Sequence, residues 1–251
     1  YYKVSDLNNY EEVVKAMGYF TYKYGKIDWV ESNNEYWLTL DARLRKDFNI
    51  TTGINSDEII NYKSKSEMKK FYRKARIPTP RYAPVTNLEK AKLFIERVGY
   101  PIVVKPDIGV GASNTHEINN EEELTAYFNN LPTDQAYIME ELITGDIITY
   151  DGICDSNGDV LVEASHITPP IMNVVNNNSD VSYYTNIKVS NRLSSVGKKA
   201  IKAFNVKSRF FHLEFFKLHE TKRGLGKAGR YVALEANMRP AGGYTPDMIN
   251  Y

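Results

Sequence analysis

Near its C-terminal end the chain carries three polar side chains of types suited to binding a metal ion and a phosphate. Residues 234–240 read Leu-Glu-Ala-Asn-Met-Arg-Pro, a pattern that predicts a strand ending in a loop. Because side chains alternate between the faces of a strand, Glu235, Asn237 and Arg239 should point the same way. Carboxylate and amide oxygens are ligands that Mg²⁺ prefers, and arginine often clamps phosphate groups. The alternative is one surface ion pair on an exposed sheet face.

A second apolar segment carries another carboxylate. Residues 211–216 read Phe-His-Leu-Glu-Phe-Phe, which predicts a strand with Glu214 in its middle. If this strand pairs with the first one, Glu214 lies beside Glu235 and the site gains its second acidic ligand. The aromatic residues around Glu214 are expected to pack in the core rather than to stack on bases.

A lysine ends a strand that is otherwise apolar and precedes a glycine-bearing loop. Lys105 lies in the predicted buried strand 101–106, and the loop 107–115 contains Gly109 and Gly111. A buried lysine is costly unless an anion neutralises it, and glycines let backbone N–H groups approach phosphate oxygens. The alternative is a lysine that reaches solvent from the end of its strand.

Four other features carry weaker signals. Lys65 opens a lysine-rich helix, which by itself more often marks a solvated face. The segment 139–145, Met-Glu-Glu-Leu-Ile-Thr-Gly, predicts a connector whose backbone could meet a flat ligand. His166 ends a predicted strand, where a histidine is more often structural. The GxGxxG at 224–229 lies between two predicted strands and opens no helix, so it predicts a hairpin loop rather than a dinucleotide site.

Composition narrows the class of protein. The chain has 251 residues, 42% of them hydrophobic, with 32 basic against 31 acidic residues. This length allows a substantial core in two or three subdomains, and the balanced charge gives no reason to expect nucleic acid or a membrane as a partner. A single cysteine, Cys154, excludes an internal disulfide framework and favours a cytoplasmic location. No apolar run approaches the roughly 20 residues of a membrane helix. We expect that sequence is missing at both ends.

The order of predicted elements indicates an α/β chain in three parts. Residues 1–80 predict three helices and one short strand, as in part of a parallel-sheet unit. The helices are expected at 8–24, 35–48 and 64–75, and the strand at 27–31. Residues 81–140 predict a helix at 88–98, the lysine-bearing strand, a helix that begins after Asn120 and a strand at 136–140. Residues 141–251 predict a hairpin of 147–154 and 160–166, a helix at 191–204 and the two carboxylate strands.

Taken in chain order, these segments resemble the ATP-grasp superfamily of carboxylate–amine ligases, in particular its carbamoyl-phosphate-synthase-like and amino-acid-ligase-like members. The resembling segments are 25–30, 34–35, 65–68, 77–80, 101–106, 139–145, 150–152, 212–214 and 234–239. The resemblance implies an ATP-grasp fold of two α+β subdomains that grip a nucleotide. The small subdomain would be 81–140 and the large one 141–251. A partial Rossmann-like pre-ATP-grasp domain, 1–80, would precede them.

The resemblance also implies ATP and Mg²⁺, for which Mn²⁺ can substitute, as cofactors. Lys65 would contact the α-phosphate, and Lys105 would contact either the phosphates or the adenine side. The mobile loop would contain Gly109, Gly111 and Ser113, and the adenine would meet Glu140, Glu141 and Ile143. Glu214, Glu235 and Asn237 would hold the metal ion, Arg239 would be catalytic, and His166 would approach phosphate or substrate. Many family members have a glutamate for the ribose where this chain has Ile147, so Asp146 or no residue takes that role here.

The implied activity is an ADP-producing ligase that activates a small carboxylate as an acyl phosphate for attack by an amine. Such chemistry needs no protein nucleophile. Two alternatives stay open: activation of bicarbonate or carbamate, as in carbamoyl-phosphate synthase, and a nucleotide-binding module without ligase activity. The implied partners are the small-molecule carboxylate and amine, with a homodimer as an open assembly state.

Overall fold

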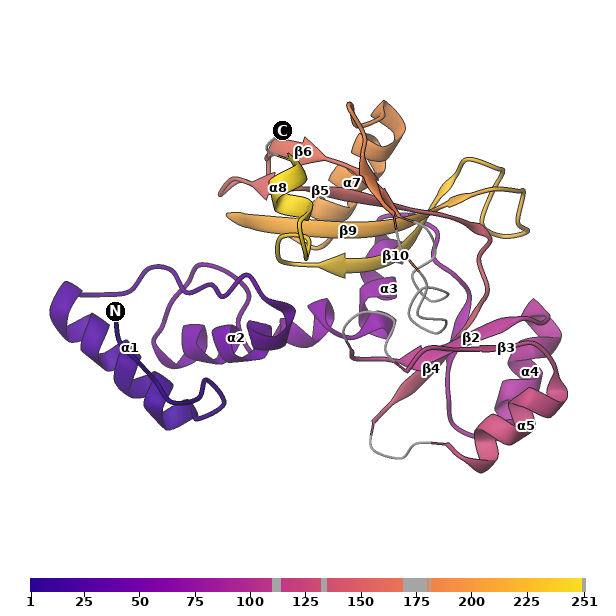
Figure 1. Cartoon of the computed structure of the whole chain (residues 1–251), viewed down its shortest axis with the longest axis horizontal. Helices are drawn as coiled ribbons and strands as arrows, with labels where there is room; N and C mark the ends of the chain where they lie inside the picture. The colour runs from indigo at the N-terminus through magenta and orange to yellow at the C-terminus, as the bar shows by residue number, and fades with distance from the viewer. Residues whose placement is uncertain (110–113, 132–134, 169–179, 181, 250–251) are drawn as a thin grey trace.

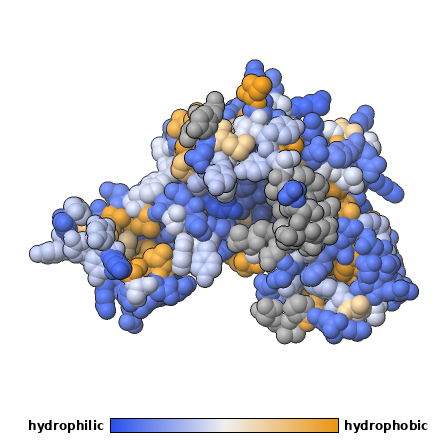
Figure 2. All heavy atoms as spheres, in the orientation of Figure 1, coloured by the Kyte–Doolittle hydropathy of each residue, from blue (hydrophilic) through white to orange (hydrophobic). Residues whose placement is uncertain are grey.

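The computed structural model of the chain describes residues 1–109, 114–131, 135–168, 180 and 182–249. It contains a helical N-terminal part, a four-stranded sheet and a six-stranded sheet (Figure 1). Hydrophilic residues gather where these three parts meet on the face shown in Figure 2. Among the described residues, no helix combines the length and the apolar composition needed to cross a bilayer.

The N-terminal part is built from helices alone. It contains α1 (Tyr10–Tyr24), the 3₁₀ helix η1 (Glu35–Trp37), α2 (Leu38–Asp47) and the 3₁₀ helix η2 (Ile59–Tyr62). The expected strand at 27–31 is wrong, since the first strand of the chain begins only at Tyr82. With no neighbouring strand to receive its backbone hydrogen bonds, this segment instead packs Ile27 and Val30 against the small core between α1 and α2.

The four-stranded sheet is antiparallel and is covered by two helices on one face. Its strand order is β1 (Tyr82–Pro84), β4 (Tyr137–Glu141), β2 (Ile102–Pro106), β3 (His116–Ile118). The helices α4 (Leu88–Val98) and α5 (Glu121–Asn129) pack Phe94 and Leu124 onto Ile102, Val104 and Met139. Because side chains alternate along β2 and β4, Lys105 and Glu140 point to the opposite face.

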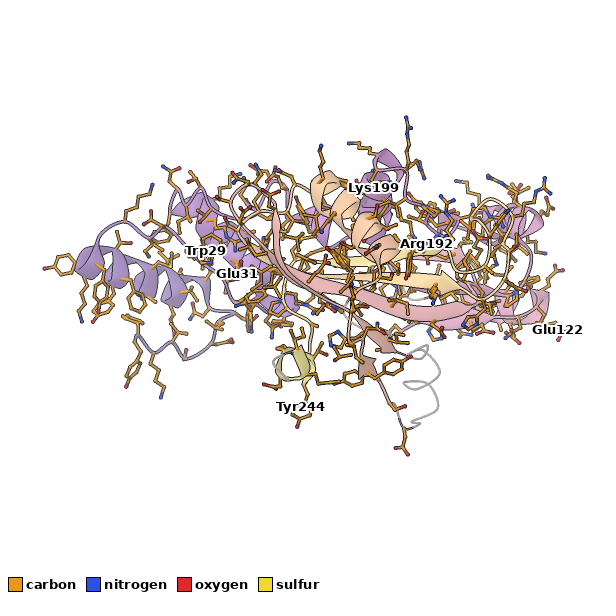
Figure 3. All side chains as sticks on the ribbon, turned by 90° about the horizontal axis from the view of Figure 1, so that it is seen from above. Trp29, Glu31, Glu122, Arg192, Lys199 and Tyr244 are labelled. Atoms are coloured by element: carbon orange, nitrogen blue, oxygen red, sulfur yellow. The ribbon has the colours of Figure 1, made fainter. Side chains whose placement is uncertain are left out.

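The six-stranded sheet contains the C-terminal half of the chain. Its main path is β10 (Tyr231–Asn237), β9 (Arg209–Leu218), β5 (Gly145–Cys154), β7 (His166–Thr168), β8 (Tyr184–Thr185), and β6 (Val160–Ala164) pairs with β5. The helices α3 (Lys65–Lys74) and α7 (Asn191–Ala203) pack on one face. The short α8 (Thr245–Ile249) lies on the other side of the sheet (Figures 1 and 3). The glycine-rich segment 224–229 forms the loop between β9 and β10, as predicted.

Alternation along β9 decides which side chains are available for chemistry. Phe211, Leu213 and Phe215 are fully buried in the core formed with α3 and α7. His212 and Glu214 therefore lie on the opposite face. That face carries the polar side chains predicted to form a site.

Candidate active site

Two glutamates lie beside each other on neighbouring strands of the six-stranded sheet. β9 and β10 run antiparallel, and their register pairs Glu235 with Glu214 and Asn237 with His212. The predicted pairing of the two carboxylate strands is confirmed. Asn237 is buried, and its side-chain nitrogen has no hydrogen-bond partner in the described part of the chain. We refer to Glu214, Glu235 and Asn237 as the acidic row.

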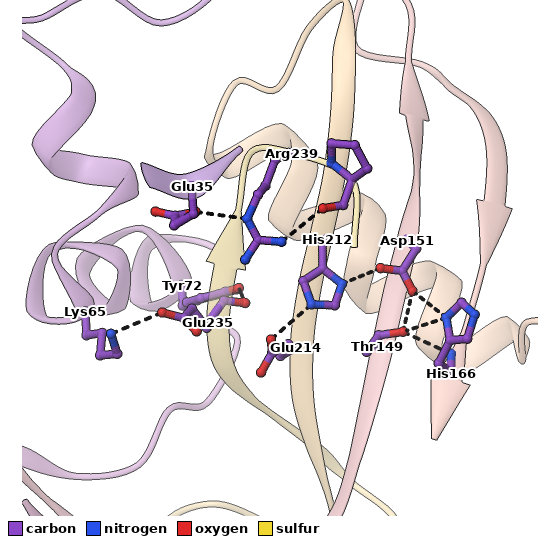
Figure 4. Close-up of polar contacts among 11 residues, drawn as sticks. Glu35, Lys65, Tyr72, Thr149, Asp151, His166, His212, Glu214, Glu235 and Arg239 are labelled. Atoms are coloured by element: carbon purple, nitrogen blue, oxygen red, sulfur yellow. Dashed lines mark hydrogen bonds and ion pairs between the residues drawn. The ribbon is translucent and has the colours of Figure 1, made fainter. Parts of the chain in front are cut away.

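The first residue of α3 contacts the acidic row. Lys65 Nζ lies 3.2 Å from Oε1 of Glu235 (Figure 4). It also donates a hydrogen bond of 3.1 Å to the carbonyl oxygen of Gly109. Its side chain is buried rather than part of a solvated helix face. Lys65 therefore connects the acidic row with the start of the glycine loop.

Asp107 fastens the start of this loop to the N-terminus of α3. Its carboxylate accepts hydrogen bonds from the hydroxyls of Ser64 and Ser66, at 2.6 and 3.1 Å, and from the backbone N–H of Ser66 at 2.8 Å. A negative charge at a helix N-terminus is favourable because it satisfies free N–H groups and opposes the helix dipole. Gly111 and Ser113, the other predicted loop residues, lie outside the described residues.

A buried cluster of two lysines and one glutamate joins α3 to the four-stranded sheet. The carboxylate of Glu140 lies 2.9 Å from Lys69 Nζ and, through its other oxygen, 2.9 Å from Lys105 Nζ. The anion that was expected to neutralise Lys105 is therefore the carboxylate of Glu140, a side chain of the protein itself. Lys69 was not predicted, although its position four residues after Lys65 on one helix was a usable signal.

The cluster keeps its carboxylate ionised. Burial by itself would raise the pKa of Glu140, but the charges of Lys105 and Lys69 lower it to about 2. Burial lowers the pKa of Lys69, and Glu140 opposes that change. Two ammonium groups sharing one carboxylate leave an excess positive charge, which favours an anionic ligand.

A second buried network runs across the six-stranded sheet from β7 to β9 (Figure 4). Asp151 on β5 accepts hydrogen bonds from Thr149 and from Nδ1 of His166, the latter at 2.9 Å. Its other oxygen lies 2.5 Å from Nδ1 of His212, whose Nε2 is 3.0 Å from Glu214 Oε1. Both nitrogens of His212 therefore contact carboxylates, which suits a doubly protonated ring.

The protonation states of this network follow from its contacts. Burial would lower the pKa of His212, but hydrogen bonds to Asp151 and Glu214 raise it to about 10. Burial would raise the pKa of Asp151, but its hydrogen bonds with His166 and His212 lower it to about 2. The pKa of Glu214 is also lowered, against burial, by His212 and by the charge of Arg239. At neutral pH an imidazolium thus supports an ionised Glu214.

Arg239 extends from the loop after β10 toward the N-terminal part. Its Nε lies 3.2 Å from Oε2 of Glu35, and its Nη1 donates to the carbonyl of Pro240 at 2.9 Å. Burial raises the pKa of Glu35, and Arg239 opposes that rise. The structure thus places Arg239 near the acidic row but pairs it with a residue 204 positions away in sequence.

Three other predicted residues have different surroundings. Glu141 points away from Glu140 and pairs with Arg81 at 2.6 Å. Ile143 is buried in a small apolar cluster at the base of the β9–β10 loop. His166 is buried behind Asp151, one strand further from the acidic row than β5. In this structure the side chains of Glu141 and His166 support neighbouring residues.

The acidic row fits a magnesium ion by the chemistry of its donors. Two adjacent carboxylates and one amide offer only oxygen ligands, and Mg²⁺ commonly takes one or two carboxylates together with substrate phosphates. Within the described ranges, no group of three or more His, Cys, Asp or Glu side chains is arranged to hold a metal ion. Two carboxylates and one amide oxygen suit an ion that completes its ligands with a phosphate.

Comparison with known proteins agrees with this fold. Residues 63–166 match the family model for the ATP-grasp (A) domain of phosphoribosylglycinamide synthetase. The chain is 25% identical, over 245 residues, to an L-arginine-specific L-amino acid ligase from Bacillus subtilis, covering 94% of this chain and 57% of that protein.

Solved structures show the same architecture. An L-amino acid ligase from Bacillus licheniformis superposes with a TM-score of 0.68 at 16% identity, covering 94% of this chain and 54% of that one. An N5-carboxyaminoimidazole ribonucleotide synthetase, solved as its ADP complex, gives 0.71 at 15% identity, covering 97% and 61%. The chain therefore has the fold of ATP-grasp proteins, and residues 63–166 match the model of an ATP-grasp domain. It spans little more than half the length of these relatives.

Proposed function

We propose that this chain forms the nucleotide-binding part of an ATP- and Mg²⁺-dependent ligase, which joins a small carboxylate to an amine through an acyl phosphate. The observation that carries the proposal is the contact between Lys65 and Glu235. It places a buried cation beside two neighbouring carboxylates, and a metal-bound phosphate needs both charges close together.

Most of the predicted residues have a role in this proposal. The nucleotide lies between the small subdomain, 81–140, and the large subdomain, 141–251. Lys65 and Lys105 bind its phosphates under the loop that contains Gly109, Gly111 and Ser113. The connector with Glu140, Glu141 and Ile143 meets the adenine through its backbone. The acidic row holds Mg²⁺, for which Mn²⁺ can substitute.

The chemistry requires positive charge where two anions meet. A carboxylate that attacks the γ-phosphate is repelled by the phosphate charge, and a Mg²⁺ ion on the acidic row would neutralise part of that charge. Arg239 offers a planar pair of donors to the acyl phosphate or its oxyanion. His212 holds Glu214 ionised and oriented through its hydrogen bond. No side chain acts as a nucleophile.

The curated relative suggests the class of substrate. Its name describes a ligase for L-amino acids with specificity for L-arginine, so amino acids are the first carboxylate and amine substrates to test. We also propose a cytoplasmic location, in keeping with the single buried and unpaired thiol of Cys154.

Two measurements on the intact protein test the proposal. Calorimetry should detect binding of ATP or ADP in the presence of Mg²⁺, and ADP release should depend on adding an amino acid. Nucleotide binding without substrate-dependent turnover would instead indicate a binding module. Turnover that depends on bicarbonate alone would favour a carbamoyl-phosphate-synthase-like reaction. Absence of nucleotide binding would refute the whole proposal.

A further inference from the structure

A basic groove of about 750 Å³ lies on the side of the six-stranded sheet that is covered by α7. It is formed by α7, by the β9–β10 loop and by the chain that leaves α3. The lining residues include five cationic side chains and no aspartate or glutamate. The five cations are Arg76, Arg192, Lys199, Lys227 and Arg230. Figure 3 shows Arg192 and Lys199 on the outer side of the molecule, away from Tyr244 and the face with α8.

Within the described residues, none of the five cations of the basic groove forms an ion pair. Lys198, the immediate neighbour of Lys199, differs in this respect because it pairs with Glu163 at 3.5 Å. Like charges gathered in one groove repel one another, so an anion that neutralises them binds favourably.

The backbone is unusual beside two of the arginines that line the groove. At Gly226, with φ +136°, a Cβ atom would lie 2.2 Å from Cδ of Arg230, so a larger residue there would push the arginine stem aside. Arg76 follows the end of α3 with φ 57°, a conformation in which glycine or asparagine is usual. An arginine in that position keeps its charge at the groove despite an unfavourable backbone.

The N-terminus of α7 adds to the positive potential. This helix has 13 residues, is capped by Ser190 and has no acidic residue in its first turn. Its first two residues, Asn191 and Arg192, line the groove. The positive end of the helix dipole is therefore reinforced by Arg192 instead of being neutralised.

The floor of the basic groove is apolar and fixed. Ile77, Pro78, Val196 and Tyr231 contribute to its lining. The carbonyl of Pro78 accepts a hydrogen bond of 2.8 Å from the backbone of Ala233, which ties the floor to β10. An apolar floor rimmed by cations suits a ligand with a ring-shaped body and charged groups at its edge.

We propose that the basic groove binds a small molecule carrying two or more phosphate groups on a ring, at a site separate from the acidic row. Three of its five cations are arginines, which bind phosphate through two parallel hydrogen bonds. The volume is within the range of roughly 300–1,000 Å³ that is typical of small-molecule sites. The net charge of +1 gives no long-range attraction to nucleic acid.

NMR signals from the backbone amides of glycines can show where a phosphate ligand binds. Protein labelled with ¹⁵N-glycine is titrated, in Mg²⁺-free buffer, with fructose 1,6-bisphosphate, tripolyphosphate, fructose 6-phosphate and a single-stranded oligonucleotide. Gly226 and Gly229 line the groove, whereas Gly109 belongs to the phosphate side of the candidate active site. The bisphosphate and tripolyphosphate should shift Gly226 and Gly229, with affinity at least about tenfold higher than the monophosphate.

Matched variants separate the groove from the nucleotide site. Arg76→Asn combined with Arg192→Gln should weaken bisphosphate binding at least about tenfold, because two arginine–phosphate contacts are lost. Asparagine tolerates the backbone conformation at position 76, so the fold should be kept. Lys198→Gln, which removes one charge from the same helix outside the groove, and Lys105→Met should each leave the affinity unchanged.

Three results would overturn the proposal. One is the absence of shifts at Gly226 and Gly229 with millimolar bisphosphate and tripolyphosphate. Another is binding that is lost in Lys105→Met but kept in the double arginine variant, which would assign the ligand to the nucleotide site. The third is a response to the oligonucleotide alone. None of these results depends on whether the protein has ligase activity.

Discussion

The four-stranded and six-stranded sheets both bury charged side chains, but with opposite sign. At the four-stranded sheet, Lys69 of α3 and Lys105 of β2 share the single carboxylate of Glu140. In the six-stranded sheet, Asp151 and Glu214 share the single imidazolium of His212. Each group of three neutralises most of its own charge, which lets the charges be buried, and keeps one charge in excess. In the proposed function, the excess positive charge would face the phosphates and the excess negative charge would face the metal ion of a Mg²⁺–nucleotide.

The largest effect on turnover should come from removing a negative charge from the acidic row. Glu235→Gln keeps the shape of the side chain but halves the charge of the paired carboxylates. Turnover should fall on the order of 10³-fold, since a charged metal ligand and its transition-state stabilisation are lost. Affinity for the nucleotide should change much less, because in the proposed function the adenine is held by the connector after β4. The measurement is ADP release at limiting Mg²⁺.

Asn237→Ala is the matched comparison for this change. It removes a neutral oxygen ligand and should reduce turnover less than Glu235→Gln does. Wild-type turnover of Glu235→Gln at limiting Mg²⁺ would mean that Glu235 and Lys65 form only a surface ion pair.

Removing the carboxylate of Glu140, beside the four-stranded sheet, should destabilise the fold. Glu140→Gln leaves the buried ammonium groups of Lys69 and Lys105 without their counter-charge, which should cost about 3 kcal/mol of unfolding free energy. Urea denaturation at neutral pH measures this loss. The folded-state pKa of Glu140, about 2, is below its ordinary value. The stabilisation from Glu140 is therefore present above about pH 4.5, and it is lost as the pH falls through 2. Equal stability of variant and wild type at pH 7 would contradict this role.

Arg239→Lys should separate geometry from charge. The substitution keeps the positive charge near Glu35 but cannot present a planar pair of donors, so turnover should fall roughly 10²-fold. The urea midpoint should stay close to that of the wild type. Full activity in the lysine variant would show that only the charge of Arg239 matters.

A smaller effect is expected on the pH dependence of the unfolding free energy, to which His212 contributes. Its folded-state pKa, about 10, is above the ordinary value of 6.5. Its stabilising contribution is therefore complete below pH 6.5 and disappears as the pH rises through 10. Wild type should exceed His212→Gln in unfolding free energy by about 2 kcal/mol at neutral pH, and by much less at pH 10.5. A constant difference would mean that His212 is neutral in the folded protein.

The smallest effect is expected at Glu220. This residue is exposed in the loop beyond β9, so Glu220→Gln should change neither turnover nor the urea midpoint. A loss of activity comparable to that of Glu235→Gln would show that charge anywhere on this sheet matters.

The helices and strands that carry the motifs could be predicted because their apolar residues recur at the spacing of a helix or a strand. The helix at 88–98 and the alternation along β9 and β10 were visible in single segments. The strand expected at 27–31 also has apolar residues. A strand, however, needs a neighbouring strand to pair with, and the sequence of a single segment does not show whether such a neighbour exists.

The partners of the charged side chains were harder to predict. The sequence indicated that Lys105 needs an anion, but not that Glu140 supplies it or that Lys69 shares it. Arg239 and Glu35 are 204 positions apart. Helix and strand periodicity relates only residues that are close in sequence, so it could not predict this ion pair. The pairing of Glu214 with Glu235 was predictable because both residues occupy the middle of strands joined by one hairpin.

The contacts that α3 makes with β10 also bear on how the protein is made. The hydroxyl of Tyr72 donates to the carbonyl of Glu235 across 163 positions of sequence, beside the Lys65–Glu235 ion pair. Contacts between segments so far apart form late, after the intervening chain has been ordered. During synthesis, α3 leaves the ribosome long before β10 exists. A growing chain therefore cannot complete the acidic row until β10, the last strand of the six-stranded sheet, is in place.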